Sequence, residues 1–421
     1  MWKVIYNILV NAVLPFFIIL SIFKKKLRKN LHERLFNTTG VNPLKNAIWI
    51  HAASIGEAII AESLINFLKK YKKGLNGDFL ITTNTFYARD MLLKKFSNSL
   101  CVSSLPLDLT FTIDHFIDGS TFKAFIIIET EIWPNLIWTA KKRSIPVIIV
   151  NGRISDKTFP IYQRFTFFLR HVLSCIDIVL AQSEEHRKRY ISIGMDPDRV
   201  ITTGNIKYYR ETPLMNVSTE KKDTITFGSV KEKELEAIYS VIKRLKDTIP
   251  HLKIYIAPRE LHLADSMEEE LKKHYRIQRY SVMKKEDGDR QTGPESAEIV
   301  IVDTTGDLLD IYEKSGVAFV GGSLAPYGGQ NILEPLFFAT PVIFGPFIEN
   351  FREIADMVLK KKAGIMVKNH EDLYEKIKYL LENKEMAREM GERGRDIIKL
   401  HRGYMEKTVE KICKIIERGH E

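Results

Sequence analysis

The chain alternates between two kinds of apolar pattern. Short runs of consecutive Val, Ile, Leu and Phe are typical of strands that are buried on both faces of a parallel sheet. Between them, stretches such as 59–68 place apolar residues at helical spacing. Strands that alternate with helices predict doubly wound α/β domains with helices on both sheet faces. The predicted strands are 47–53, 79–83, 101–105, 124–129, 146–150, 177–182, 200–203, 224–228, 253–257, 299–302, 317–320, 341–344 and 364–367.

The strand series divides into two halves, as a chain of 421 residues allows. Residues 206–223 lose apolar periodicity and include Pro213, so we expect the interdomain linker there. This predicts a first Rossmann-like domain over 24–210 and a second over 224–421, with the final helices free to pack back on the first domain. Residues 283–297 are polar and contain glycine, which indicates a surface insertion.

The N-terminus departs from the soluble pattern. Residues 4–23 are mostly apolar, although two asparagines and Pro15 interrupt them, and five basic residues follow within 24–29. The stretch is barely long enough to span ~30 Å of hydrocarbon. No small-residue cleavage site precedes the basic run, which disfavours a signal peptide. We therefore expect a membrane anchor over 1–23, either spanning or interfacial, with the rest of the chain on the cytoplasmic side.

The net charge of +10 points to acidic partners such as nucleic acid, an anionic membrane or a phosphorylated substrate. No basic strand with interleaved aromatic residues is present, so nucleic acid is not expected. The position of the basic run favours an anionic membrane surface. Cys101, Cys175 and Cys413 are scattered without the spacing of metal ligands.

Two carboxylates mark the end of one predicted strand. Glu129 and Glu131 follow the apolar run 126–128, and Trp133 and Pro134 close the turn. Ligands of open α/β sheets bind at the carboxyl ends of strands. If the strand runs through 131, the two carboxylates share one strand face. Substrate binding or catalysis is the sharper interpretation, and a purely structural pair of carboxylates is the alternative.

A third carboxylate follows the first strand. Glu57 falls in the first turn of the helix predicted after 54, where the helix dipole favours a negative charge. A carboxylate held ionised there is suited to accept a proton from an alcohol. The alternative is a glutamate that only complements the helix dipole.

The second half carries candidate phosphate-binding turns. Ser229 follows Gly228 at a strand end and is expected to cap the next helix. Arg259 offers a planar, fixed charge at another strand end. Glycines at 306, 321–322 and 328–329 suit close approach of the backbone to a ligand. No G-x-G-x-x-G follows the first strand of either half, which weighs against a nicotinamide enzyme.

Motifs spread along the chain resemble those of the Kdo transferases, which move 3-deoxy-D-manno-oct-2-ulosonic acid (Kdo) from CMP-Kdo onto a lipid A precursor. The resemblance implies an inverting GT-B glycosyltransferase, with two Rossmann-like domains facing a cleft, at the cytoplasmic side of the cell inner membrane. It implies lipid IVA as acceptor, in lipopolysaccharide core biosynthesis. The motifs are HAASIGEA (51–58), TTNT (82–85), ETEIWPN (129–135), NGRIS (151–155), AQSE (181–184), TGNIK (203–207), GSVKEKE (228–234), APR (257–259), VDTTGDL (302–308), GGSLAPYGGQNILEP (321–335) and GPFIENF (345–351).

On this resemblance, Glu57 is the expected base, Glu131 binds acceptor or donor sugar, and Glu129 is structural. Arg153 and Lys207 are second-rank candidates for acceptor phosphates or the Kdo carboxylate, and His51 ranks below them. CMP is expected at Ser229, Arg259, Gly306, Gly328, Gly329, Asn331 and Glu334.

Gln330 stands where the family motif carries His, so a cationic role is in doubt at that position. No clustered Asp/His metal signature is visible, so transfer is expected to need no metal or other cofactor.

Two alternatives stay open. One is another nucleotide-sugar enzyme on the same scaffold, an epimerase or a CMP-sialic-acid transferase. The other is a membrane-tethered nucleotide-binding protein without catalysis, which would not depend on both Glu57 and Glu131. The sequence does not give the number of Kdo residues transferred or the oligomeric state.

Overall fold

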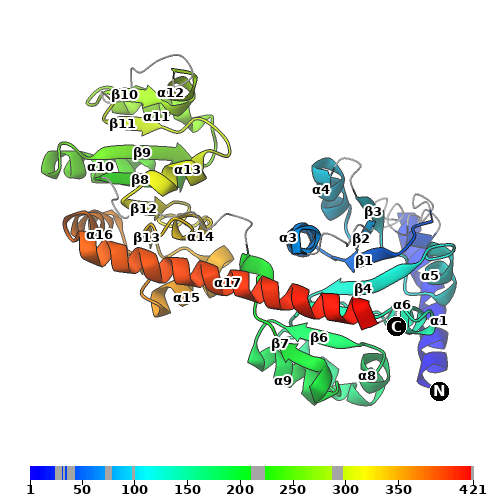
Figure 1. Ribbon diagram of the computed structural model, residues 1–421. Coiled ribbons are helices and arrows are strands. Elements are labelled where there is room, and N and C mark those ends of the chain that lie inside the picture. Colours follow the sequence, from blue (N-terminus) through cyan, green and yellow to red (C-terminus); the bar gives the residue numbers. More distant parts are fainter. Residues whose placement is uncertain are drawn as a thin grey trace. The chain divides into compact units, whose positions relative to one another are not determined.

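The computed structural model describes residues 1–23, 31, 34–35, 43–71, 78–96, 100–209, 223–286 and 297–418. The chain forms two compact units, the first comprising Met1–Glu211 with His401–Glu421 and the second Thr212–Leu400. Each contains one seven-stranded parallel sheet (Figure 1). The predicted pair of parallel α/β domains is confirmed. Most of the predicted linker and insertion, and the basic run at 24–29, lie outside the described residues.

In the first unit, the sheet order is β3-β2-β1-β4-β5-β6-β7. Strands β2 and β3 therefore lie on one side of β1, and β4 to β7 lie on its other side. This reversal is the switch point at which doubly wound sheets bind ligands. The strands are β1 (Ala47–His51), β2 (Phe79–Thr83), β3 (Cys101–Ser104), β4 (Phe122–Ile128), β5 (Val147–Gly152), β6 (Ile178–Ala181) and β7 (Val200–Thr202).

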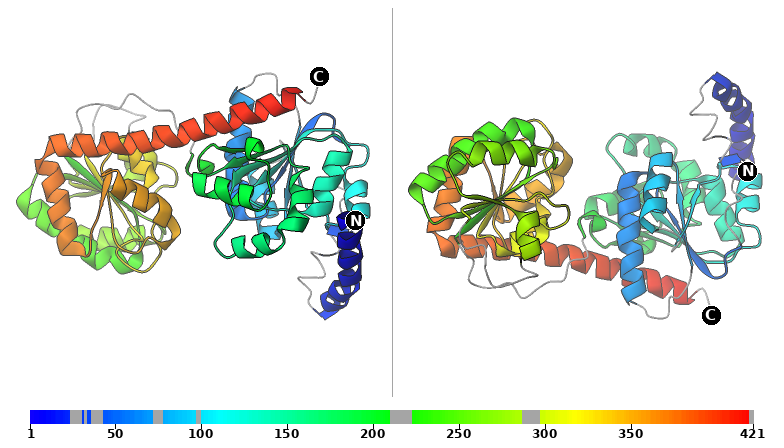
Figure 2. Two further views of the ribbon diagram at one scale, coloured as in Figure 1. Left: turned by 90° about the horizontal axis from the view of Figure 1, so that it is seen from below. Right: turned by 90° about the horizontal axis from the view of Figure 1, so that it is seen from above.

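Alternate residues of β1 enter two separate cores. Ile48 and Ile50 belong to the cluster on one sheet face, and Trp49 belongs to the cluster on the other. Helices cover both faces, as the side chains require (Figure 2). The helices of this unit are α1 (Trp2–Phe23), α3 (Ile55–Tyr71), α4 (Phe86–Phe96), α5 (Thr110–Phe116), α6 (Pro134–Lys142), α7 (Phe159–Arg164), α8 (Thr166–Leu173) and α9 (Glu184–Ser192), with 3-10 turns η1 (Pro197–Arg199) and η2 (Ile206–Tyr208).

The second sheet has the order β10-β11-β9-β8-β12-β13-β14, with its reversal between β8 and β12. Every strand except β10 was predicted; β10 is a half-buried edge strand in which only Ile277 is apolar, so it gives no apolar run. The strands are β8 (Thr224–Val230), β9 (Lys253–Pro258), β10 (Ile277–Arg279), β11 (Ile299–Ile301), β12 (Val317–Val320), β13 (Val342–Phe344) and β14 (Gly364–Met366).

The helical elements of the second unit are α10 (Leu235–Thr248), α11 (Leu263–Leu271), α12 (Tyr280–Glu286), α13 (Leu308–Lys314), α14 (Leu333–Leu336), α15 (Arg352–Lys360) and α16 (His370–Glu382), with 3-10 turns η3 (Glu232–Glu234) and η4 (Glu349–Phe351).

The last helix, α17 (Lys384–Arg418), belongs to both units, because its residues from His401 onward are part of the first. Met405, Val409 and Ile412 are buried in the same cluster as Ile48 and Ile50. The end of the chain thus completes the core of the unit in which the chain begins.

Helix α1 forms over the predicted anchor and is bonded to the first unit by its polar residues. The Tyr6 hydroxyl donates to Asp108 Oδ2 at 2.7 Å. The side-chain amides of Asn7 and Asn135 bond each other reciprocally, both at 3.0 Å. Within the described part of the chain, no helix has the length and apolarity needed to cross a bilayer. Attachment of this helix to a membrane stays a prediction.

We predict that Ile412→Ala destabilises the first unit by about 2–5 kcal/mol, because a fully buried side chain would leave a cavity. All four tryptophans lie in this unit, so their fluorescence during urea unfolding reports on it alone. Lys414→Ala, an exposed change on the same helix, is the control and should shift stability by less than about 1 kcal/mol. Equal midpoints for the two variants would contradict the assigned packing.

Candidate active site

The loops that follow β1, β2 and β4 bring polar side chains to one edge of the first sheet. Glu57 comes from the start of α3 after β1, Asn84 follows β2, and Glu129 and Glu131 follow β4. Because these strands are parallel neighbours, their carboxyl ends meet at the switch point. The charges of Glu129 and Glu131 both act on Glu57. The structure therefore brings together the three carboxylates predicted from two separate stretches of sequence.

Glu57 is bonded to the turn that starts α3. Its Oε2 accepts from the Ala53 backbone N–H at 2.7 Å, and its Oε1 accepts from the Ser54 hydroxyl at 2.9 Å. Ser54 Oγ accepts in return from the Glu57 backbone N–H at 3.3 Å. This is close to a capping box, in which Ser and Glu three residues apart satisfy the first helical turn. Glu57 therefore stabilises the start of α3, which is the structural role that the sequence offered as an alternative to catalysis.

Burial raises the pKa of Glu57 to about 7, even though the hydrogen bonds from Ala53 and Ser54 lower it. The negative charges of Glu129 and Glu131 raise it further. Desolvation outweighs the local donors, so Glu57 is only partly ionised near neutral pH, whereas the helix terminus alone would keep it fully ionised. A carboxyl group with a pKa close to 7 is well matched to general acid–base catalysis.

Glu129 does not share a strand face with Glu131, because β4 ends at Ile128. Glu129 has a φ of 61°, in the left-handed region that residues other than glycine rarely adopt. Its backbone N–H still donates to Val150 O at 2.8 Å, so the turn begins directly at the strand end. Such backbone conformations cost free energy and cluster at functional sites.

Glu131 is surrounded by polar groups with spare bonding capacity. Its Oε2 accepts from Trp133 Nε1 at 2.9 Å and from Asn84 Nδ2 at 3.3 Å. His51 Nε2 lies 3.9 Å from the same oxygen. In the part of the chain that the structure describes, His51 Nε2 and Asn84 Oδ1 are buried without hydrogen-bond partners. Since unpaired buried polar atoms are costly, this arrangement favours a polar ligand beside Glu131.

Sequence reasoning ranked His51 low and did not select Asn84, although both lie in motifs at the ends of predicted strands. His51 is fully buried at the end of β1, and its Nδ1 is 3.0 Å from Thr82 O. A hydrogen bond to that carbonyl requires the proton on Nδ1, which leaves Nε2 as an acceptor in the neutral ring. For Asn84, the useful signal was the place of TTNT at the end of its strand, with Asn84 the first residue after β2.

Arg34 was missed entirely, because it lies in a stretch without any recognisable motif. Its Nε donates to Leu105 O at 2.9 Å, and its guanidinium lies 6.0 Å from the centre of the Trp133 ring. Burial lowers the pKa of Arg34, while the charges of Glu131 and Asp108 act in the opposite direction. Arg34 therefore places a positive charge next to the carboxylates.

The two second-rank basic residues lie at different places in the first unit. Arg153 follows β5, and its backbone N–H donates to Thr130 Oγ1 at 3.2 Å, which places it beside the loop after β4. Lys207 lies in η2, with its Nζ 5.8 Å from the centre of the Tyr208 ring. Both side chains are exposed. Arg153 is thus adjacent to the carboxylate loop, whereas the aromatic contact of Lys207 is with its neighbour Tyr208.

In the second unit, Ser229 does not cap a helix. It has a φ of 55° within β8, and Lys231 precedes the 3-10 turn η3 that leads into α10. The residue that organises this turn is Glu234, which is 1% exposed.

Glu234 accepts hydrogen bonds from backbone N–H groups of the loop after β12. The donors are Gly322 at 2.6 Å, Ser323 at 2.9 Å and Leu324 at 2.8 Å. Backbone amides that converge in this way form an anion-binding concavity. Here a carboxylate of the chain itself occupies it, so a ligand phosphate has to be held elsewhere.

The glycine-rich loop before α14 has the predicted unusual backbone. Gly328 and Gly329 have φ values of 83° and 82°, and a Cβ at Gly328 would lie 2.4 Å from Asn350 Nδ2. Asn331 Nδ2 donates to Glu334 Oε1 at 3.0 Å, so these two candidates form one unit. Helix α14 has only four residues, so the expected contribution of its dipole to anion binding is small.

The other two donor-site candidates lie at separate strand ends. Arg259 follows β9, and its side chain is exposed. Gly306 has a φ of 97°, and nothing lies within 4 Å of a Cβ built on it. The neighbouring Asp307 accepts from Lys284 Nζ at 2.6 Å and does not cap its helix. The turn around Gly306 is therefore open.

Comparison with known proteins gives the family. A family model described as 3-deoxy-D-manno-octulosonic-acid transferase (kdotransferase) matches residues 29–210. The chain is 30% identical over 434 residues to the 3-deoxy-D-manno-octulosonic acid transferase of Haemophilus influenzae, and the alignment covers 100% of both proteins. The chain belongs to the Kdo transferase family. The resemblance seen in the motifs is confirmed, and the protein is a glycosyltransferase that transfers Kdo.

Two further similarities are more limited. The chain is 30% identical over 401 residues to a bifunctional glycosyltransferase/methyltransferase of Fusobacterium nucleatum, covering 91% of this chain but only 60% of that protein. The crystal structure of UDP-GlcNAc 2-epimerase from Neisseria meningitidis bound to UDP-GlcNAc has a TM-score of 0.52 at 13% identity, covering 89% of this chain and 100% of that chain. At that identity, the likeness concerns the fold alone.

We predict that Glu234→Ala loosens the loop after β12 in this Kdo transferase. Each amide left without its acceptor costs about 1–3 kcal/mol, so local opening becomes easier. Hydrogen exchange at Gly322, Ser323 and Leu324, followed by mass spectrometry, should accelerate at least ~10-fold. Glu232→Ala removes an exposed carboxylate two residues away and should leave these rates unchanged. Similar rates in both variants would refute the role of Glu234.

Proposed function

We propose that this Kdo transferase uses CMP-Kdo as donor and a lipid A precursor, lipid IVA, as acceptor, with inversion at the anomeric carbon. The observation that carries the proposal is the group of Glu57, Glu131 and His51 at the switch point of the first sheet. It combines a carboxyl group whose pKa is near 7 with buried polar atoms that lack partners. In the proposed GT-B arrangement, this unit receives the acceptor and the second unit holds the donor.

In the proposed reaction, Glu57 in its ionised form takes the proton from the acceptor hydroxyl. The oxygen forms a bond to the anomeric carbon of Kdo while the bond from that carbon to the CMP phosphate oxygen breaks. CMP leaves with the electron pair of the broken bond. Glu131, bonded to Trp133 and Asn84, orients the sugar. Removing a proton during attack typically contributes 10²–10⁴-fold to such a rate.

The donor site is proposed at the edge of the second sheet where the order reverses between β8 and β12. The paired Asn331 and Glu334 offer polar groups for ribose hydroxyls, while Gly306, Gly328 and Gly329 allow close approach. Arg259 and the backbone around Ser229 are proposed to stabilise the leaving phosphate, because the amides beyond β12 are already bound to Glu234.

The protein is further proposed to act at the cytoplasmic face of the inner membrane, in contact with anionic lipid through α1 and the basic residues 24–29. The support for this location is the exposed apolar side of α1, where Ile8, Leu9 and Phe16 are each about 60% exposed. A helix of this kind can lie in the interface plane of a membrane.

The central test is transfer by the purified protein from CMP-Kdo to a lipid A precursor, followed by mass spectrometry of the lipid. Glu57→Gln keeps the size and a hydrogen-bond acceptor but removes the base, so turnover should fall at least ~100-fold with the fold intact. Glu62→Gln, on the same helix, is the matched control and should stay near the wild-type rate. Absence of a Kdo-bearing product with the wild type would reject the proposed function.

The pH dependence provides a second test. A base with a pKa of about 7 makes kcat/KM rise with pH up to about 7 and level off above it. Glu131→Gln removes a negative charge that raises the pKa of Glu57, so the rising limb should move to lower pH, whatever its effect on the maximum rate. An unmoved limb would assign the titration to another group.

Metal independence is also proposed. Among the described residues, no three His, Cys, Asp or Glu side chains are grouped so that they could hold a metal ion. Preorganised positive charges and backbone dipoles can stabilise a leaving phosphate in place of a metal. Activity should therefore persist in excess EDTA after metal removal. Loss of activity that magnesium or manganese restores would contradict this proposal.

A further inference from the structure

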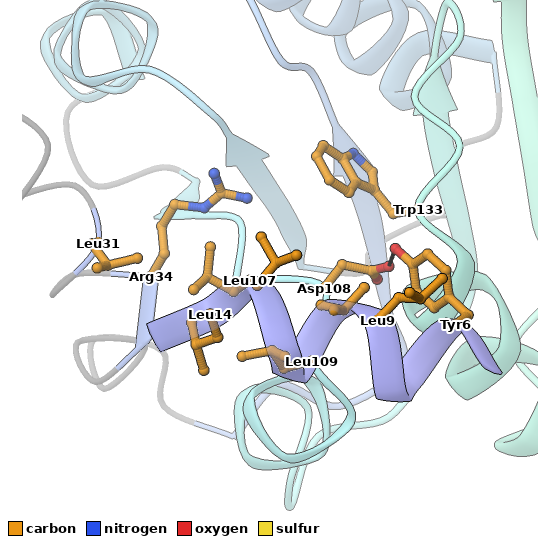
Figure 3. A pocket seen from close by; sticks show the side chains of 11 residues that line it. Tyr6, Leu9, Leu14, Leu31, Arg34, Leu107, Asp108, Leu109 and Trp133 are labelled. Carbon is orange, nitrogen blue, oxygen red and sulfur yellow. Dashed lines mark hydrogen bonds between the residues drawn. The ribbon is translucent and has the colours of Figure 1, made fainter. Parts of the chain in front are cut away.

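An apolar pocket of about 490 Å³ lies in the first unit between α1 and the loop before α5. Leu9 and Leu14 of α1 line it together with Leu107 and Leu109 (Figure 3), and Val13 of α1 is a further lining residue. A volume of this size is in the range of small-molecule sites, roughly 300–1000 Å³, and so suits one chain-like ligand.

The polar groups in the wall of this pocket are already bonded within the protein. Asp108 accepts from the Tyr6 hydroxyl at 2.7 Å, and its carboxylate also accepts from the backbone N–H groups of Asn135 at 3.1 Å and Leu136 at 2.9 Å. The Tyr6 hydroxyl points at this carboxylate (Figure 3). Because these groups have their partners, an apolar ligand would leave none of them newly unpaired.

One end of the pocket borders the carboxylate site through Trp133. Trp133 lines the pocket, and its Nε1 donates to Glu131 Oε2 at 2.9 Å. Arg34 also lines the pocket, with its guanidinium 6.0 Å from the centre of the Trp133 ring. In space, the apolar pocket is followed by the positively charged Arg34 and then by the carboxylates. This order matches a lipid with an alkyl tail, an anionic headgroup and a reactive hydroxyl.

We infer that this pocket receives one acyl chain of the acceptor lipid, with an anionic group of its headgroup beside Arg34 and its hydroxyl directed toward Glu57 and Glu131. This inference rests on the proposed function. The acyl chain lies against α1, so the N-terminal helix is part of the acceptor site. A chain seated there also limits how far the headgroup can move relative to the base, which favours the reacting geometry.

The pocket can be blocked without disturbing the core. Val13 is 47% exposed and lines the pocket, so Val13→Trp should fill it from the solvent side. Leu93 of α4 is similarly exposed, at 45%, and does not line the pocket, which makes Leu93→Trp the matched control. Val13→Trp should lower kcat/KM for the acylated acceptor at least tenfold more than for the deacylated headgroup. Leu93→Trp should leave both values unchanged.

The dependence of kcat/KM on acyl-chain length provides an independent test of the pocket. Each methylene withdrawn from an apolar site weakens binding about fourfold, so kcat/KM of the wild type should fall by roughly that factor per methylene until the pocket is empty. Val13→Trp should abolish this dependence. Equal losses in Val13→Trp and Leu93→Trp, or a wild type whose kcat/KM does not depend on chain length, would overturn the inference.

Binding without turnover separates this inference from the proposed function. An acylated acceptor that carries a photoreactive diazirine at one chain end should label Leu9–Leu14 or Leu107–Leu109 of the wild type, with or without CMP-Kdo. Labelling confined to the outer side of α1 would contradict the pocket, and so would equal labelling by a phospholipid analogue. Correct labelling without any Kdo product would refute the proposed reaction alone.

Discussion

The pairing of β1 with β4 is the constraint on which the site depends. Because the two strands are parallel and adjacent, although one lies far ahead of the other in sequence, the loops after them emerge at the same edge. That edge receives Glu57 from one loop and Glu129 and Glu131 from the other. The pairing is itself held by the sheet cores, in which β1 places alternate side chains on opposite faces. Loss of this register would separate the carboxylates even if every helix formed.

Glu57 shows how one side chain can serve both the fold and the chemistry. Its hydrogen bonds to Ala53 and Ser54 fix the start of α3 and position the carboxylate. The same bonds would keep it strongly acidic in water, but burial and the neighbouring carboxylates oppose them. The result is a group that is rigidly placed and still able to take and release a proton near neutral pH.

The strands could be predicted from the sequence, because buried parallel strands appear in it as uninterrupted apolar runs. The sequence failed for the three-residue edge strand β10 and for features that depend on contacts between distant segments. The φ of Glu129, the position of Arg34 beside Trp133 and the capture of loop amides by Glu234 have no local signature. Glu57 and Glu131 were found because they follow strands in recognisable motifs. Asn84 met the same condition, so it could have been found by the same reasoning.

The reciprocal amide pair between Asn7 and Asn135 has an evolutionary consequence. Each side chain supplies the donor and the acceptor that the other requires, and Asn135 is buried. A substitution at Asn7 leaves the buried Asn135 amide oxygen without this donor, which costs more than replacing both residues together. The two positions should therefore change as a pair among descendants of this chain. A relative that lost its N-terminal helix should carry a different residue at the position of Asn135.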